Sequence, residues 1–148
     1  MKAIIKTELN IQAKHAWQLV KKSETLIYVC KGLLSFEGSD LFPVTWREGE
    51  TIQTHLRFFG IIPAWRHSLL FHTISEPSMT MFTQEQGGLI KSWDHEIKFE
   101  VKDSKTCIYT DTVKIKAGAF TALVWLFANI LYRYRQRRWK QLLPQKLA

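Results

Sequence analysis

The residues of this sequence best suited to acid–base chemistry are His95 and Asp111. A carboxylate that bonds one imidazole nitrogen fixes the tautomer of the ring and leaves the other nitrogen free to act as a base. With a hydrogen-bond donor for a developing oxyanion, such a pair would suit the cyclisation, dehydration or isomerisation of an apolar carbonyl compound. Tyr109 and Arg66 are the donors that the sequence offers.

Two strands must bring this pair together. Within a strand predicted at 89–102, residues 93–102 alternate between inward-facing and charged side chains, which is typical of an antiparallel strand with one face on a core. Residues 106–116 also alternate, with Asp111 as the exception on their apolar face. The two apolar faces match only across an odd loop, so we predict a three-residue loop at 103–105. This register pairs Phe99 with Tyr109, Ile97 with Asp111 and His95 with Val113, and it makes His95 and Asp111 diagonal neighbours about 7–8 Å apart at Cα.

Each candidate also has a structural interpretation. His95 could equally be a neutral, hydrogen-bonded core residue, and Asp111 could form a salt bridge with His95 or Arg133. The indoles of Trp65 and Trp93 could simply fill the core. Arg66 and His67 have opposite parity in their strand, so only one of them faces inward.

No further catalytic pattern accompanies the pair, since the sequence has no nucleophile elbow, glycine-rich phosphate loop, paired-histidine motif or dense carboxylate cluster. Cys30 and Cys107 lack the spacing of a disulfide framework or of a metal site. We therefore expect no metal and no cofactor, and we favour binding over catalysis. The expected ligand-binding residues are Trp65, Arg66, Trp93, His95, Tyr109, Asp111, Phe127 and Leu131.

Composition indicates a core rich in aromatic rings. The chain has 148 residues, and its 46% hydrophobic content excludes disorder. Six Trp, nine Phe and four Tyr indicate that the core, or a cavity within it, is built largely from rings. No linker or repeat divides the chain, so we predict a single domain, 1–148.

Periodicity and turn residues predict the order of the elements. A strand at 3–11 is followed by two short helices, at 13–22 and 23–32, and then by a strand and a loop within 33–44. Strands follow at 50–59, 64–75, 78–85, 89–102 and 106–116, and a long helix covers 118–143. One apolar stripe of this helix contains Phe120, Leu123, Val124, Phe127, Leu131 and Tyr134, and a second face contains Trp125, Tyr132 and Trp139.

Positive charge gathers in the last helix. The net charge is +8, and five cations fall within eight residues: Arg133, Arg135, Arg137, Arg138 and Lys140. These cations could stabilise the end of the helix dipole, or they could bind an anionic membrane together with the aromatic residues of the second face. Nucleic acid is disfavoured, because the outer strand faces carry acids as well as lysines. The many rings on one small domain also leave a homodimer open.

The N-terminal segment interrupts its apolar run too early for a secretory signal, and no uncharged apolar stretch reaches 18 residues. We therefore expect a cytoplasmic protein.

The element order and several local motifs resemble the SRPBCC superfamily, also called START-like or Bet v 1-like, which includes polyketide cyclases. The motifs are Trp46-Arg47-Glu48-Gly49, the run from Phe58 to His67, Trp93-Asp94-His95 with Phe99, and the segment from Thr106 to Val113. The nearest resemblance is to the poorly characterised ligand-binding SRPBCC group.

The resemblance implies an α+β helix-grip fold, in which a curved antiparallel seven-stranded sheet surrounds a long C-terminal helix and two short helices follow the first strand. It also implies binding of a hydrophobic small molecule, lipid-like or aromatic, in a cavity between sheet and helix. The superfamily contains transporters as well as enzymes, so the fold does not fix a reaction. An enzyme that uses His95 and Asp111, and a lipid carrier that docks on membranes, are the alternatives.

Overall fold

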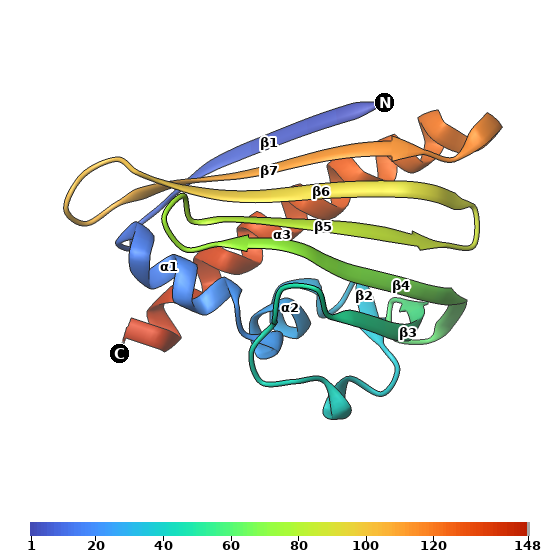
Figure 1. The fold of residues 1–148 in the computed structure, drawn as a ribbon, viewed down its shortest axis with the longest axis horizontal. Coiled ribbons are helices and arrows are strands. Elements are labelled where there is room, and N and C mark those ends of the chain that lie inside the picture. The colour runs from blue at the N-terminus through green and yellow to red at the C-terminus, as the bar shows by residue number, and fades with distance from the viewer. Residues whose placement is uncertain (148) are drawn as a thin grey trace.

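Residues 1–147 are described by a computed structural model. Seven antiparallel strands form one sheet in the order β1-β7-β6-β5-β4-β3-β2. Figure 1 shows the long helix α3 crossing one face of this curved sheet. The strands are β1 (Lys2–Leu9), β2 (Leu34–Phe36), β3 (Thr51–Phe58), β4 (Ile62–Ser75), β5 (Thr80–Gly87), β6 (Ile90–Val101) and β7 (Cys107–Lys116). The helices are α1 (Ala13–Val20), α2 (Ser23–Cys30) and α3 (Thr121–Leu147), with 3-10 turns η1 (Ser39–Leu41) and η2 (Gly118–Phe120).

This arrangement is the helix-grip fold that the sequence predicted, with two short helices directly after β1. Irregular pairing bends the sheet where β3 meets β4, where β4 meets β5, and where β5 meets β6. An extra residue in one strand of a pair increases local twist, so these positions help to curve the sheet.

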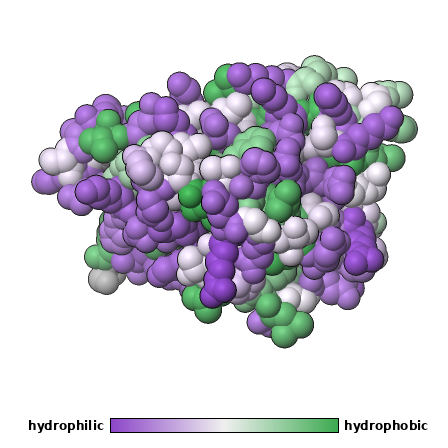
Figure 2. All heavy atoms as spheres, in the orientation of Figure 1, coloured by the Kyte–Doolittle hydropathy of each residue, from purple (hydrophilic) through white to green (hydrophobic). Residues whose placement is uncertain are grey.

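The predicted register between β6 and β7 is confirmed. Phe99 pairs with Tyr109, Ile97 with Asp111 and His95 with Val113. The loop 103–105 is closed by Asp103, whose Oδ1 accepts hydrogen bonds from the backbone N–H groups of Lys105 and Thr106 at 2.8 and 2.9 Å. Alternation along β6 turns its charged residues away from α3, and Figure 2 shows a mainly hydrophilic surface on this strand side of the molecule.

The middle of the chain departs most from the predicted boundaries. Segment 33–44 contributes only a three-residue strand, β2, before η1. β4 begins at Ile62, before the predicted start at residue 64, and therefore includes Pro63. Proline is tolerated there because Pro63 lies beside the irregular pairing of β3 and β4, where the regular ladder is interrupted.

The face that α3 turns toward the sheet also differs from the predicted stripe. Leu131 is buried as expected, but Phe120 and Leu123 are 50% and 63% exposed. The buried face instead includes two polar residues, Arg135 and Gln136. Apolar periodicity misplaces this face because it assigns both polar side chains to solvent. The buried residues of α3 are Ala128, Leu131, Tyr132, Arg135, Gln136, Trp139, Leu142 and Leu143.

Both ends of α3 lie later than predicted. Gly118 has a φ of +56°, which is incompatible with a right-handed helix, so α3 begins only at Thr121. The helix continues past Pro144 to Leu147. Contacts with α2 hold this last turn: Gln145 donates to the Tyr28 hydroxyl at 3.1 Å, and Lys146 pairs with Glu24 at 2.8 Å.

Rings fill one part of the interior. Phe99 stacks on Tyr109 with ring centroids 4.9 Å apart, and Trp139 meets both rings edge-on at 5.8 and 5.6 Å. Between the sheet and the first half of α3 the interior is not filled, and the candidate site lies there. No helix among residues 1–147 is both long and apolar enough to cross a membrane.

Candidate ligand-binding site

A cavity of about 430 Å³ separates the sheet from the first half of α3. Ligand-binding cavities commonly have volumes of about 300–1,000 Å³, so this one is large enough for a small molecule. Most of its lining is apolar or aromatic, and its strongly polar side chains are Thr54, His67, Glu85 and Arg135. The apolar and aromatic lining includes Leu34, Phe36, Ile52, Leu56, Phe58, Trp65, Leu69, Ile90, Trp93, Phe127 and Leu131.

Strand alternation places these side chains. On β4, Trp65, His67 and Leu69 share the inner face. Phe58, from β3, meets the Trp65 ring edge-on at 5.8 Å and the Phe127 ring edge-on at 5.6 Å. Through Phe127, which belongs to α3, the aromatic wall of the cavity continues from sheet to helix.

The turn between β5 and β6 supports Trp65. Gly88 has a φ of +54°, and a Cβ at this position would lie 2.5 Å from the Trp65 ring. Only glycine permits both this backbone conformation and this close approach. The turn that contains Gly87 and Gly88 therefore also positions a cavity residue.

Four of the eight expected ligand-binding residues line this cavity: Trp65, Trp93, Phe127 and Leu131. His95 instead lines a smaller cavity of about 40 Å³, which lies on the α1 and α2 side of Arg135. Tyr109 and Asp111 line neither cavity.

Arg66 was predicted to bind the ligand, but it does not face the cavity. Its side chain is exposed, whereas the neighbouring His67 is 5% exposed and lines the cavity. The parity of β4 permits only one of the two to face inward, and the structure selects His67. His67 Nε2 lies 2.8 Å from Glu85 Oε2, so the inward position brings an imidazole–carboxylate pair with it.

Glu85 keeps its negative charge beside this imidazole. Burial raises the pKa of its carboxyl, but the hydrogen bond and charge of His67, together with the positive charge of Arg135, outweigh burial and lower the pKa. Thr83 donates a further hydrogen bond to Glu85 at 3.2 Å.

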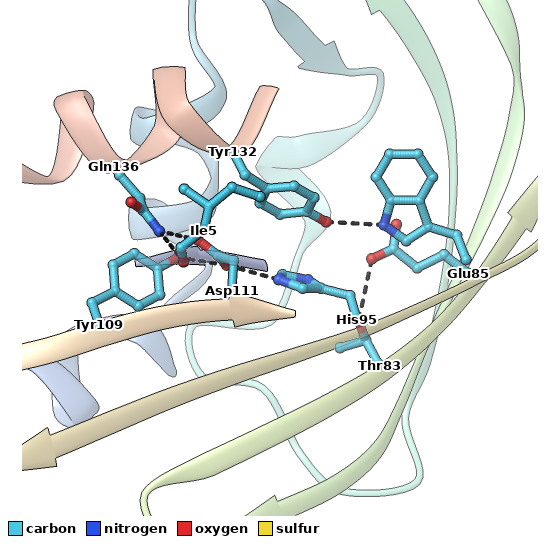
Figure 3. A network of polar contacts seen from close by, with 9 residues as sticks. Ile5, Thr83, Glu85, His95, Tyr109, Asp111, Tyr132 and Gln136 are labelled. Atoms are coloured by element: carbon cyan, nitrogen blue, oxygen red, sulfur yellow. Dashed lines mark hydrogen bonds and ion pairs between the residues drawn. The ribbon is translucent and has the colours of Figure 1, made fainter. Parts of the chain in front are cut away.

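His95 and Asp111 are in direct contact, as the register predicts. Figure 3 shows their network, which Gln136 reaches from α3. Tyr132, also on α3, accepts a separate hydrogen bond from Trp93 Nε1 at 2.9 Å. Asp111 Oδ1 lies 2.8 Å from His95 Nε2 and accepts a bond from the Tyr109 hydroxyl at 2.9 Å. Asp111 Oδ2 accepts from Gln136 Nε2 at 3.0 Å. The carboxylate is therefore bonded through both oxygens and 0% exposed, a pattern typical of a structural anchor.

The five cations of α3 were predicted to act together, but they differ in burial. Arg133, Arg137 and Lys140 are exposed, but Arg135 is 7% exposed and lines both cavities. Arg138 lies over the Tyr28 ring and donates to the Tyr28 carbonyl. Tyr132 and Trp139, which were expected at a membrane surface, are buried, with exposed fractions of 1% and 0%.

The cavity opens between α3 and the turn after β5. Leu89, Leu123, Leu126 and Ile130 line it and yet are 51–63% exposed, so they mark its mouth. Figure 1 shows the start of α3, the β5–β6 turn and the β3–β4 hairpin at the same end of the molecule. Phe59 and Ile61 in the β3–β4 hairpin are 60% and 75% exposed, but they do not line the cavity.

Sequence reasoning assigned none of the strongly polar side chains of the cavity, Thr54, His67, Glu85 and Arg135, to the ligand-binding site. Parity left His67 open, and Glu85 shares its parity with the buried residues Met81 and Thr83 of β5. Arg135 follows Tyr132 by three residues and precedes Trp139 by four, a spacing that marks one helix face. Cys30 also lines the cavity, and burial raises the pKa of its thiol to about 11. Among residues 1–147, His, Cys, Asp and Glu side chains form no cluster of three that could hold a metal ion.

The comparisons with known proteins agree with this architecture. A family model described as "Domain of unknown function (DUF8410)" matches residues 7–143. The chain belongs to this family. No curated protein matches the sequence.

Solved structures share the fold of this DUF8410 protein at low sequence identity. Norcoclaurine synthase from Thalictrum flavum, in complex with dopamine and hydroxybenzaldehyde, is 12% identical, with a TM-score of 0.67 over 98% of this chain and 88% of that one. Protein NE0264 from Nitrosomonas europaea is 14% identical, with a TM-score of 0.75 over 99% and 96%.

The di-domain ARO/CYC protein BexL, from the BE-7585A biosynthetic pathway, is 9% identical, with a TM-score of 0.72 over 95% of this chain and 45% of that one. At these identities the likeness establishes the fold, and it supports the SRPBCC resemblance at that level.

Proposed function

We propose that this protein binds a hydrophobic small molecule, lipid-like or aromatic, in the cavity between sheet and α3, without catalysing a reaction. The observation that carries the proposal is a cavity of about 430 Å³ with a mostly apolar lining and an apolar mouth. Burying an apolar ligand there would remove its surface from water, which stabilises the complex by about 25 cal/mol per Å². The shared fold of norcoclaurine synthase, which was solved with two small aromatic molecules, and the resemblance to ligand-binding SRPBCC proteins are consistent with this role.

The position of His95 and Asp111 argues against catalysis by this pair in the larger cavity. His95 and Asp111 bond to each other, to Tyr109 and to Gln136, and they do not line the larger cavity. A base must come within hydrogen-bond reach of the substrate, so an enzyme that uses this pair would need its substrate elsewhere.

A filled-cavity variant tests the binding proposal. We expect N-phenyl-1-naphthylamine, an apolar fluorescent probe, to bind the wild-type protein and to gain fluorescence on leaving water. Leu131→Trp adds ring volume to the cavity wall and should weaken binding at least tenfold. Leu41→Trp adds the same atoms at an 85% exposed position in η1 and should bind as wild type does.

Failure of the wild-type protein to bind any apolar probe would contradict the proposal, and so would equal binding by both variants. Native mass spectrometry of freshly purified protein would add the mass of any ligand that copurifies.

A second candidate function, a lipid carrier that docks on anionic membranes, is favoured by the surface around the mouth. The exposed residues Leu123, Leu126 and Ile130 follow one another at helical spacing on the outer face of α3. Arg133, Arg137 and Lys140 continue the same face. We call this row of six residues the outer stripe of α3.

An anionic membrane fits both halves of the outer stripe, because apolar side chains enter the headgroup boundary while cations remain at the phosphates. A second copy of the chain fits less well. Two parallel stripes would place cations against cations, and two antiparallel stripes would place cations against leucines.

Vesicle co-sedimentation tests this docking. We expect binding to vesicles with phosphatidylserine, weaker binding at 0.5 M salt, and none to phosphatidylcholine alone. Leu126→Asp should abolish binding, and Leu41→Asp, outside the stripe, should preserve it. A dimer in solution that Leu126→Asp dissociates, with no vesicle binding, would contradict docking and identify a homodimer surface. A cytoplasmic location stays a prediction.

A further inference from the structure

Arg135 is a buried cation without a hydrogen-bonded counterion. Its side chain leaves α3 on the inner face and is 7% exposed. Within residues 1–147 no ion pair or hydrogen bond to Arg135 is found, and its Nε, which solvent does not reach, has no hydrogen-bond partner. The guanidinium lies over the Tyr132 ring, 5.1 Å from the centroid, which is its one defined polar contact.

The two carboxylates of the interior are engaged elsewhere. Asp111 accepts its bonds from His95, Tyr109 and Gln136. Glu85 is bonded to His67 and Thr83. Asp111 and Glu85 both interact with the charge of Arg135 through space, but neither forms an ion pair with it. A guanidinium stays charged at any pH that the protein tolerates, and a buried charge is costly unless it is paired.

In the part of the chain that the structure describes, most of the buried nitrogens that lack a hydrogen-bond partner belong to residues that line the larger cavity. Besides Arg135 Nε, three other buried nitrogens also lack a hydrogen-bond partner. Trp65 Nε1 and His67 Nδ1 belong, like Arg135 Nε, to residues that line the larger cavity, whereas Trp139 Nε1 belongs to a residue that lines only the smaller one. The arginine and tryptophan nitrogens are donors only. Because the Glu85 carboxylate of the lining is already bonded to His67 and Thr83, a ligand that carries its own acceptor would supply the partner that Arg135 lacks.

We infer that the ligand is an amphipathic carboxylic acid whose carboxylate pairs with Arg135 while its apolar body extends through the cavity toward Leu123 and Leu126. Arginine bonds a carboxylate through two parallel N–H groups, which fixes the depth and orientation of the ligand. The inference rests on the proposed binding function and names the chemical class of its ligand. It also assigns Arg135 a role inside the protein, apart from the exposed cations of the outer stripe.

Three ligands with the same chain length separate the head group from the tail. Decanoate, decan-1-ol and decylamine are titrated by calorimetry at pH 7 into the wild-type protein and into Arg135→Gln and Arg133→Gln. We expect the wild type to bind decanoate at least about tenfold more tightly than decan-1-ol, because hydrogen bonds to charged groups are the stronger ones. Decylamine should bind least.

The two variants locate the preference. Arg135→Gln should bind decanoate and decan-1-ol equally, with decan-1-ol as in the wild type. Arg133→Gln removes an exposed cation two residues away and should keep the full preference for decanoate. Arg135→Lys retains the charge without the paired donors and should show an intermediate preference.

The outcomes distinguish this inference from the function on which it rests. Equal binding of decanoate and decan-1-ol by the wild type overturns the role of Arg135 but leaves hydrophobic binding in place, and this result does not depend on any variant folding. Unchanged preference in Arg135→Gln overturns it as well. If neither these ligands nor N-phenyl-1-naphthylamine bind, the binding function fails and the inference fails with it.

Discussion

His95 Nε2 and Asp111 Oδ1 lie 2.8 Å apart on neighbouring strands, and the carboxylate of Asp111 is completely buried. Because Asp111 also accepts bonds from Tyr109 and Gln136, one side chain joins β6, β7 and α3. The pair that most suggested catalysis in the sequence thus holds the helix on the sheet.

Asp111→Ala tests this structural role. The substitution leaves three buried donors without their acceptor, so we expect the free energy of unfolding to fall by about 3–5 kcal/mol. Urea denaturation measures the loss. Glu96→Ala, on the exposed face of β6, should change stability by less than about 0.5 kcal/mol. If Asp111→Ala is as stable as Glu96→Ala, the network does not hold the helix.

Gly88→Ala tests the support of Trp65. A left-handed backbone costs an L-residue about 1–2 kcal/mol, and the clash with the Trp65 ring adds about 1–3 kcal/mol. Gly60→Ala is the matched control, because Gly60 also has a positive φ, of +74°, but a Cβ there meets nothing within 4 Å. Urea denaturation should therefore give Gly88→Ala a lower free energy of unfolding than Gly60→Ala. Equal losses would show that the turn does not position the indole.

The thiols should be unreactive in the folded protein. Burial raises the pKa of Cys30 and of Cys107 from 9.0 to about 11, so few thiolates form at pH 8. We expect Ellman's reagent to modify both thiols in urea and neither under native conditions. Rapid reaction of the native protein would show that the cavity admits the reagent to Cys30.

The same shift predicts a loss of stability at high pH. Between about pH 9 and 11 the folded protein retains thiol protons that the unfolded chain releases, so the free energy of unfolding falls as pH rises. Urea midpoints between pH 8 and 11 should fall less steeply for Cys30→Ala than for the wild type. Parallel curves would contradict the effect.

Glu85 predicts the opposite dependence in acid. Its pKa is lowered in the folded protein, so its contribution is present above the unfolded pKa, near 4.5, and is lost as pH falls through the folded pKa. Glu85→Gln should therefore lose less stability than the wild type between pH 6 and pH 3. Glu96→Gln controls for removal of a surface charge, and its curve should follow the wild type.

The strands could be predicted because their chemistry is local. From Asp94 to Glu100 every second residue of β6 is charged, and the length of the 103–105 loop then determines which residues of β7 pair with this strand. These two facts are enough to make His95 and Asp111 diagonal neighbours, although they leave open whether Asp111 bonds His95 or Arg133.

The cavity lining was harder to predict because buried polar groups break the apolar pattern. Arg135 carries a charge that periodicity assigns to solvent, although it lies on the inner face of α3. His67 and Arg66 are adjacent on one strand, and only the curvature and pairing of β4 decide which of them faces inward. The mouth depends on side chains from α3 and from the turn between β5 and β6, which no local pattern relates.

Gln136 divides α3 into two unequal parts. Its amide donates to the Ile5 carbonyl at 2.9 Å and to Asp111, which clamps the helix at that point to β1 and β7. Beyond this clamp the helix is buried through Trp139, Leu142 and Leu143, whereas the preceding turns overlie the cavity and attach to the sheet edge through the bond from Trp125 Nε1 to the Lys2 carbonyl. The second part of the helix is held more firmly than the first, so backbone amide hydrogens should exchange faster over 121–130 than over 131–143. Entry of a ligand would then require only residues 121–130 of α3 to bend away from the sheet, while the sheet and residues 131–143 stay in place.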